Sequence, residues 1–261
     1  MRPTIWLLAV VGLFAGGCEF KPKFNPNDPN QVSADRQPVV IQAYFKQMSD
    51  DVIGPAVSAA QITREKGDQM MVEGAKDYLN TIHLKDTPPN LMWMLGDEFI
   101  TAHDWKRAKT FLEQALKVDT GPDRLVHDRV WFARCQAELG EVDEAIKTAR
   151  SAFEAPPYWK WPILYAVIYE IVPAAEREKP SARLALAQLV KDSIKQHEAA
   201  SGTGSDVTRL DYLIRRQYHI NRAWRLVEEL YDAANRPDLA RAAAVEAIGN
   251  SKHSSAKAIQ T

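Results

Sequence analysis

Two His-Asp dipeptides are the residues of this chain whose types suggest metal chemistry. His103 precedes Asp104, and His127 precedes Asp128. A metal-dependent phosphohydrolase needs several such ligands converging on one ion. Here one dipeptide falls at an expected turn between helices and the other at an expected helix start, where an Asp commonly caps the helix. We therefore expect helix capping, and neither a metal site nor another cofactor.

The stretch 201–205 (SGTGS) could suggest phosphate binding. A phosphate-binding loop continues into Lys and then Ser or Thr, and these residues do not follow here, so the stretch predicts a linker. The sequence shows no set of residues typical of a catalytic site, and we expect a protein that is not an enzyme. A buried cluster of titratable side chains in a cleft would favour the alternative, an enzyme.

Cys18 is the next residue with an evident chemical role. It follows Ala15-Gly16-Gly17 and an apolar run from Ile5 to Phe14, which is shorter than the ~20 residues that span a bilayer. This order resembles the bacterial lipobox, although Ala15 stands where most lipoboxes have Leu. The resemblance implies that residues 1–17 are a lipoprotein signal peptide and that Cys18 carries the acyl (palmitate-type) lipid. The alternatives are an ordinary signal peptide with an incidental Cys, or a buried helix.

A lipoprotein start would place the chain in the cell envelope, anchored to a membrane and facing the periplasm or the outside. Glu19 differs from the Asp that often retains lipoproteins at the inner membrane, which favours the outer membrane. Residues 18–37 are rich in Pro and Asn and poor in apolar side chains, and such a composition predicts a flexible tether.

The charge balance and the cysteine content bear on which classes of function and covalent links are expected. The chain has 33 Lys and Arg against 34 Asp and Glu, which argues against nucleic-acid binding. If Cys18 is acylated, Cys135 has no partner for a disulfide within the chain, and we expect Cys135 to be a small core residue.

From Pro38 onward the apolar residues follow the helical period. Residues 39–48 and roughly 55–83 predict helices of an N-terminal helical region, 38–88. Two segments after Pro88-Pro89 align at an offset of 37 residues, with Gly96 on Ala133 and Ala108 on Ala145. We assign residues 89–250 to an array of helical repeats and residues 251–261 to a disordered tail.

The two aligned segments resemble the tetratricopeptide repeat (TPR), a helix-turn-helix unit of about 34 residues. Leu95-Gly96 and Phe99 match its first helix, and Gly140 fits the inter-helix turn of the second unit. Residues 224–248 resemble a further unit, and the apolar segments around 161–175 and 182–196 look like another hairpin. The resemblance implies an all-α fold, a right-handed superhelix (solenoid) of TPR-like hairpins.

In the family, the first helix of each hairpin lines a groove that binds a peptide or protein segment. The positions carried over to this chain define the expected groove: Asn90, Trp93, Asp97, Thr101, His127, Val130, Arg134 and Glu138. The basic and asparagine residues with which some repeat proteins clamp a peptide carboxylate are not reproduced, so recognition of a free C-terminus is not expected.

A basic face is expected on the helix predicted for residues 206–234. The spacing of Arg215, His219, Arg222 and Arg225 places them within ~120° of one another. This face could bind a carboxylate, an anionic partner or lipid head groups. The alternative is a solvated face with local ion pairs, such as Arg225 with Glu229.

We expect a membrane-anchored scaffold or adaptor that holds envelope proteins or peptide segments through its groove. The alternative is a ligand- or glycan-binding lipoprotein that uses the aromatic side chains of the segment 158–161 (YWKW). Those aromatics could equally be wedges between consecutive hairpins.

Overall fold

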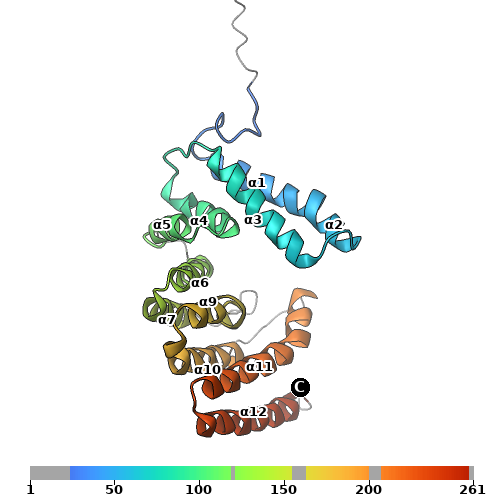
Figure 1. The fold of residues 1–261 in the computed structure, drawn as a ribbon, viewed down its shortest axis with the longest axis vertical. Coiled ribbons are helices and arrows are strands. Elements are labelled where there is room, and N and C mark those ends of the chain that lie inside the picture. The colour runs from blue at the N-terminus through green and yellow to red at the C-terminus, as the bar shows by residue number, and fades with distance from the viewer. Residues whose placement is uncertain (1–23, 119–120, 155–162, 200–206, 259–261) are drawn as a thin grey trace, which may run out of the picture.

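The computed structural model describes residues 24–118, 121–154, 163–199 and 207–258. Within these ranges the chain is all-helical and contains no strand, as expected from the periodicity. The helices form a stack whose long axis runs from the N-terminal helices to the C-terminal ones (Figure 1).

The N-terminal region is a long bent helix that packs against a second helix. Helix α1 (Gln37–Gln47) continues through a π-helical turn, η1 (Met48–Ile53), into α2 (Gly54–Ser58). A turn follows in which Ala60 has a φ of 53°, and α3 (Arg64–Asn80) begins after Thr63, whose hydroxyl accepts from the Lys66 amide. The helix predicted over 55–83 is therefore interrupted at residues 59–63.

Residues 24–37 differ from the predicted tether, because they fold against the segment that follows α3. The buried Gln37 amide donates to the carbonyls of Pro29 and His83, and its oxygen accepts from the Lys85 amide. The Asn30 side chain donates to the Thr81 carbonyl and accepts from the His83 amide. Val32 is buried, with 3% of its surface exposed. The prediction of a tether can therefore apply only to residues 18–23. These residues and the predicted signal peptide lie outside the described residues.

Two helical hairpins follow, and they coincide with the two aligned sequence segments. After a short 3-10 turn, η2 (Pro89–Leu91), the first hairpin pairs α4 (Met92–Thr101) with α5 (Trp105–Ala115). The second pairs α6 (Pro122–Glu138) with α7 (Val142–Ser151), which ends in the 3-10 turn η3 (Ala152–Glu154). Gly96 permits the close approach of α4 and α5, since a Cβ there would lie 2.7 Å from Leu112 Cγ.

The third hairpin is irregular. Its first arm runs through α8 (Ile163–Ala166), the π-helical turn η4 (Val167–Ile171) and α9 (Val172–Glu178), which has Pro173 in its first turn. After η5 (Pro180–Ala182), α10 (Arg183–Ala199) forms the second arm. Inserted residues of π-helical turns often occur at functional sites.

The fourth hairpin consists of α11 (Val207–Ala233) and α12 (Pro237–Ala258). Helix α12 continues through most of the residues predicted to be a disordered tail. The segment 251–258 contains no Gly or Pro, so nothing in its sequence ends the helix before Ala258.

The turns of three hairpins share one backbone geometry. The middle residue of each turn has a positive φ: 51° at His103, 78° at Gly140 and 59° at Asn235. The amide of the following residue donates to the carbonyl five positions earlier, over 2.9 Å, at Phe99, Gln136 and Tyr231. The turn of the third hairpin differs, because Lys179 there has an extended backbone with a φ of −141°.

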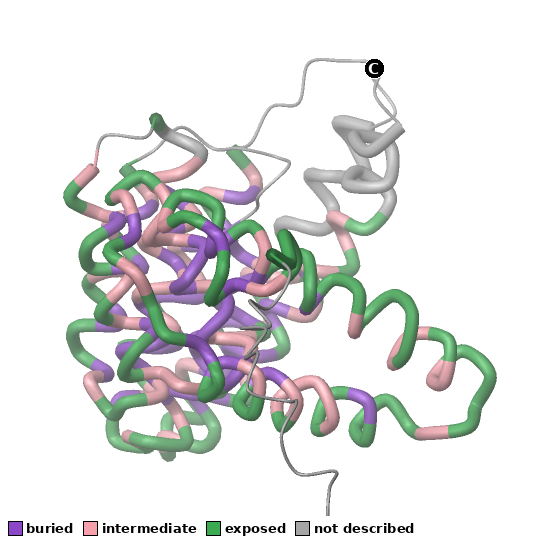
Figure 2. Tube along the Cα trace, turned by 90° about the horizontal axis from the view of Figure 1, so that it is seen from above, coloured by how far each residue is buried: buried purple, intermediate pink, exposed green. Residues whose placement is uncertain are grey.

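Side-chain contacts between hairpins show that the helices form two layers. The first helices adjoin one another through Asp97 with His127, Arg134 with Glu170, and Tyr169 with His219. The second helices α7, α10 and α12 are linked by Arg150 with Asp192 and by Lys191 with Glu246. The buried residues gather on the inner parts of the stacked hairpins, where the Cα tube in Figure 2 is purple.

Candidate binding surface

Three of the predicted groove residues, Trp93, Asp97 and His127, meet at the contact of α4 with α6. His127 Nε2 lies 3.4 Å from Asp97 Oδ2, and His127 Nδ1 lies 3.0 Å from Asp128 Oδ1. The guanidinium of Arg124 pairs with Asp128 and stacks 3.6 Å from the Trp93 ring centroid. We call these five residues the α4–α6 cluster.

Burial changes the acidity of the carboxyl groups at this contact. Loss of solvent raises the pKa of Asp97 to about 6, although His127 and Arg124 act in the opposite direction. Burial also raises the pKa of the neighbouring Glu98 to about 8, and the charge of Asp97 adds to that rise. Asp97 Oδ1 is buried without a hydrogen bond in the structure.

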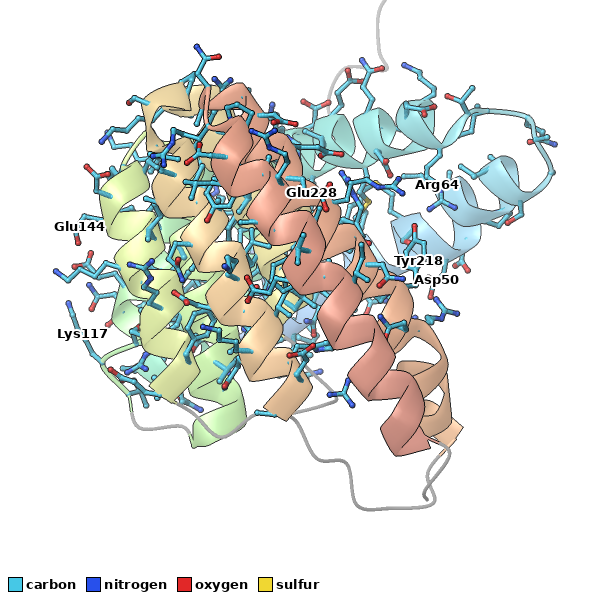
Figure 3. All side chains as sticks on the ribbon, turned by 90° about the horizontal axis from the view of Figure 1, so that it is seen from below. Asp50, Arg64, Lys117, Glu144, Tyr218 and Glu228 are labelled. Carbon is cyan, nitrogen blue, oxygen red and sulfur yellow. The ribbon has the colours of Figure 1, made fainter. Side chains whose placement is uncertain are left out.

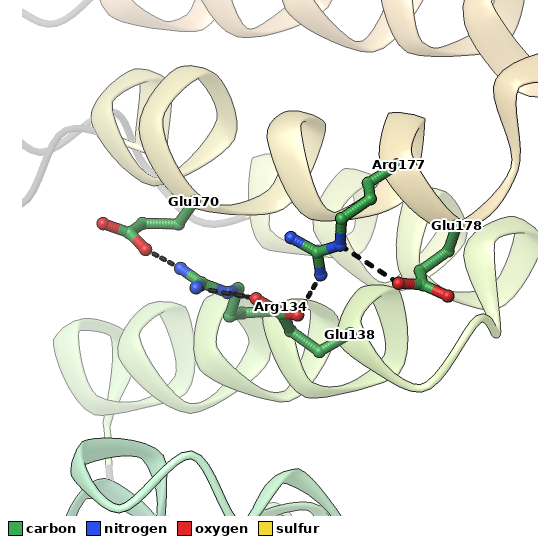
Figure 4. Close-up of polar contacts among 5 residues, drawn as sticks. All are labelled: Arg134, Glu138, Glu170, Arg177 and Glu178. Atoms are coloured by element: carbon green, nitrogen blue, oxygen red, sulfur yellow. Dashed lines mark hydrogen bonds and ion pairs between the residues drawn. The ribbon is translucent and has the colours of Figure 1, made fainter. Parts of the chain in front are cut away.

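A second group of charged side chains joins α6 to the first arm of the third hairpin (Figure 4). Arg134 pairs with Glu138, at 2.8 Å from its Oε1, and also with Glu170. Glu138 in turn pairs with Arg177, whose Nε donates to Glu178 over 3.1 Å. Arg134 and Glu138 were both predicted to contact a partner, and the structure places both in this α6–α9 network.

The third group lies where η4 meets α11. The Tyr169 hydroxyl is 3.1 Å from His219 Nδ1, and the ring centroids of Tyr165 and Tyr218 lie 4.1 and 5.2 Å from that of His219. Burial, and to a smaller extent Arg215, lowers the pKa of His219. Tyr169 and Tyr218 remain 43% and 66% exposed.

Other predicted positions occupy varied environments. Val130 is fully buried, so it belongs to the core and cannot line an open groove. Thr101 donates to the Asp97 carbonyl one helical turn earlier, and Asn90 is exposed. Arg215 and Arg225 are exposed, and Arg222 Nη1 lies 3.2 Å from Glu229, in place of the Arg225 pair considered from the sequence.

The two His-Asp dipeptides and Cys135 have structural surroundings that the structure describes. Asp104 caps α5 by accepting from the Arg107 amide, as expected, whereas Asp128 lies inside α6 and pairs with Arg124. Cys135 is buried, and burial raises the pKa of its thiol to about 12, which agrees with the predicted core role. Within the described residues no group of three or more His, Cys, Asp or Glu could hold a metal.

Sequence reasoning missed Arg124, Tyr169, Glu170 and Arg177 as members of these groups. Arg124 could have been found from its spacing of four residues to Asp128, which favours an ion pair on a helix. The contacts of the other three depend on how successive hairpins stack, and no local pattern indicates them. The aromatic segment 158–161, the linker 201–205 and Cys18 lie outside the described residues.

No protein-family model matches this chain, and comparison with curated proteins gives no significant match. Among the helices that the structure describes, none is long and apolar enough to cross a membrane.

Proposed function

We propose that this chain is a non-catalytic scaffold that binds protein or peptide partners on the layer of first helices. The α4–α6 cluster, the α6–α9 network and the Tyr169–His219 group follow one another along that layer. Trp, Tyr and Arg are the side chains that contribute most at protein interfaces. The first group contains Trp and Arg, the second contains Arg, and the third contains Tyr. This continuous series is the observation that carries the proposal.

A TPR-like, right-handed solenoid is the architecture that we infer for the array. Its support is the shared turn geometry of three hairpins at His103, Gly140 and Asn235. The close approach at Gly96 supports it as well, because the repeat pattern requires a small residue there. A stack of this kind offers an extended surface on which several partner segments could bind side by side.

Attachment to the bacterial envelope through acylated Cys18 completes the proposal. Its support is the lipobox-like sequence alone. Because residues from 24 onward fold onto the body, residues 18–23 would form the whole tether. At ~3.3 Å per residue they span only about 20 Å, so the scaffold would act close to the membrane surface.

The partner-binding proposal can be tested by site-specific photocrosslinking in native membranes. A photoreactive residue replaces the exposed Asn90, beside the first helices, or Lys147, on the second layer, where its side chain is 79% exposed. We expect a discrete crosslinked protein from position 90 and none from position 147. Absence of a specific product at position 90, or equal products at both positions, would overturn the proposal.

The anchor is tested separately by mass spectrometry of the mature N-terminus and by Cys18→Ser. We expect an acylated Cys18 in the wild-type protein and loss of membrane association in the variant. A mature protein with unmodified Cys18 in the membrane-free fraction would refute the anchor and leave the scaffold proposal standing.

A further inference from the structure

Helices α1 to α3, residues 37–80, form an arm whose outer half stands away from the stack. We call residues 48–74 the distal arm, all of which the structure describes. Figure 2 and Figure 3 both show it projecting beyond the stacked hairpins, and Gly67 is its one buried residue. The side-chain hydrogen bonds and ion pairs of these residues stay within the arm: Lys46–Asp50, Thr63–Lys66, Lys66–Gln69 and Gln69–Glu73.

The two helices of the arm meet in successive contacts along their length. At the base, the rings of Tyr44 and Tyr78 stack with their centroids 3.7 Å apart. At the tip, Ile53 and Val57 pack onto Gly67, where a Cβ would lie 3.1 and 2.9 Å from their Cγ2 atoms. The absence of a side chain at position 67 therefore lets η1 and α2 approach α3 closely.

A methionine sulfur makes the contact between the base and the tip. Met48 begins η1, and a Cβ at Gly74 would lie 2.8 Å from its Sδ, so the sulfur occupies space that a side chain at position 74 would fill. Met48 is half-buried, and it packs against the edge of the N-terminal core together with Met71. Solvent therefore reaches a side chain that also holds η1 against α3.

We propose that Met48 is a modification site, oxidised to the sulfoxide by peroxides, and that its oxidation separates η1 and α2 from α3. Hydrogen peroxide transfers one oxygen atom to the sulfur: the thioether loses two electrons, the O–O bond breaks, and the other oxygen leaves as water. Methionine sulfoxide reductases reverse the step with two electrons from thiols and release the oxygen as water. This modification is separate from the proposed scaffold function and does not depend on it.

Oxidation weakens the arm because the sulfoxide oxygen is polar and requires hydrogen-bond donors. The Met48 sulfur lies against the backbone of α3 at Gly74, where the amides already donate within the helix. The oxygen is hydrated only when η1 moves away from α3. Few contacts oppose this movement, since the distal arm buries only Gly67 and its polar side chains bond within the arm.

The test combines peptide mapping with limited trypsin digestion of the purified chain, before and after treatment with hydrogen peroxide. We expect a sulfoxide at Met48 and about fivefold faster cleavage after the exposed Lys66, because cleavage follows the population of the opened arm. Methionine sulfoxide reductases should restore slow cleavage. Met48→Leu should be cleaved slowly with and without peroxide, because leucine is apolar, similar in volume and not oxidised.

Met92 provides the matched control. It is half-buried like Met48, but it lies on α4, outside the arm, so Met92→Leu should respond to peroxide like the wild type. A second pair of variants needs no oxidant. Met48→Gln places a polar group against Gly74 and should speed cleavage after Lys66, whereas Met92→Gln should leave that cleavage unchanged.

Absence of a sulfoxide at Met48, or a sulfoxide there with unchanged cleavage after Lys66, would overturn the inference. Equal acceleration by peroxide in Met48→Leu and the wild type would overturn it too, because the arm would then open for another reason. If Met48→Leu is cleaved rapidly before oxidation, the glutamine variants decide, and equal cleavage of both contradicts a role for Met48. The crosslinking test at position 90 judges the scaffold function independently of these results.

Discussion

At the scale of single residues, the most unusual feature is the group of acidic side chains on α4 and α6. Asp97, Glu98 and Asp128 are all largely withdrawn from water. Asp128 is compensated by Arg124, and Asp97 approaches His127. A buried charge is costly without such partners, so Glu98 instead remains neutral at pH 7 because its pKa is raised to about 8.

Glu98 should make the stability of the fold depend on pH. Its folded pKa of about 8 exceeds the value of 4.5 for an unperturbed Glu, so the native state retains a proton that the unfolded chain releases. The stability from the neutral carboxyl is complete below pH 4.5 and is lost as the pH rises towards 8. Glu98→Gln should match the wild type at pH 4.5 and exceed it by on the order of 3 kcal/mol at pH 9.

Urea unfolding at the two pH values measures this difference. The substitution Glu113→Gln, at an exposed position of α5, serves as the control and should leave the stability unchanged at both. A difference between Glu98→Gln and wild type that is the same at pH 4.5 and pH 9 would contradict the prediction.

At the scale of elements, the hairpin turns decide where each helix reverses. A left-handed residue closes three of the four turns, and only one of those three is a glycine. A non-glycine residue in this conformation destabilises the fold by roughly 1–2 kcal/mol. At His103 this cost is partly offset because its ring stacks on that of Trp105, with the ring centroids 4.9 Å apart. The same turn therefore forms from three different sequences.

Substitutions at these turns should have opposite signs. Gly140→Ala should destabilise the fold by about 1 kcal/mol, since a Cβ meets nothing within 4 Å there and only the positive φ penalises it. Asn235→Gly should stabilise by up to ~1 kcal/mol, because glycine adopts its φ of 59° without strain. Chemical unfolding of each variant measures the effect.

Gly249→Ala provides the matched control for Gly140→Ala. Gly249 also has open space around it, but it lies inside α12, so alanine should add about 0.5–1 kcal/mol of stability. If Gly140→Ala stabilised the fold as Gly249→Ala does, the positive φ at position 140 would not penalise alanine, and the prediction would be wrong.

At the scale of the whole molecule, the N-terminal segment closes one end of the stack. Helices α1 and α3 share a core with the first hairpin through Ile41, Phe45 and Leu79. Residues 24–36 are held onto this region by hydrogen bonds of the buried Gln37 side chain and of Asn30. This attachment determines how far the folded body can lie from the predicted anchor at Cys18.

Gln37→Ala should release residues 24–36. The change removes three hydrogen bonds and leaves the buried carbonyl of Pro29 without its donor, which should cost roughly 1–3 kcal/mol. Limited proteolysis followed by mass spectrometry should then show cleavage before residue 37 in the variant and protection in the wild type. The exposed Gln69→Ala on α3 is the control, and equal cleavage of both variants would contradict the prediction.

Several features follow from the sequence alone because their causes are local. Helical periodicity predicts the all-α fold, and the spacing of Gly96, Ala108, Ala133 and Ala145 identifies two hairpins before their contacts are known. Gly140 marks a turn because glycine readily adopts a positive φ. Cys135 is predicted as a core residue from its place on the apolar side of a helix, and the structure confirms it.

Only the tertiary structure decides which side chains of different hairpins meet. It unites Asp97 with His127 and Arg134 with Glu170, and it places Tyr169 beside His219, because the offset between stacked helices is set by packing and not by sequence spacing. It also folds residues 24–37 onto the body, since the buried contacts of Gln37 lie 46 to 48 residues further along the chain. The prediction of a tether used only the composition of residues 18–37, and composition carries no information about contacts with residues so far along the chain.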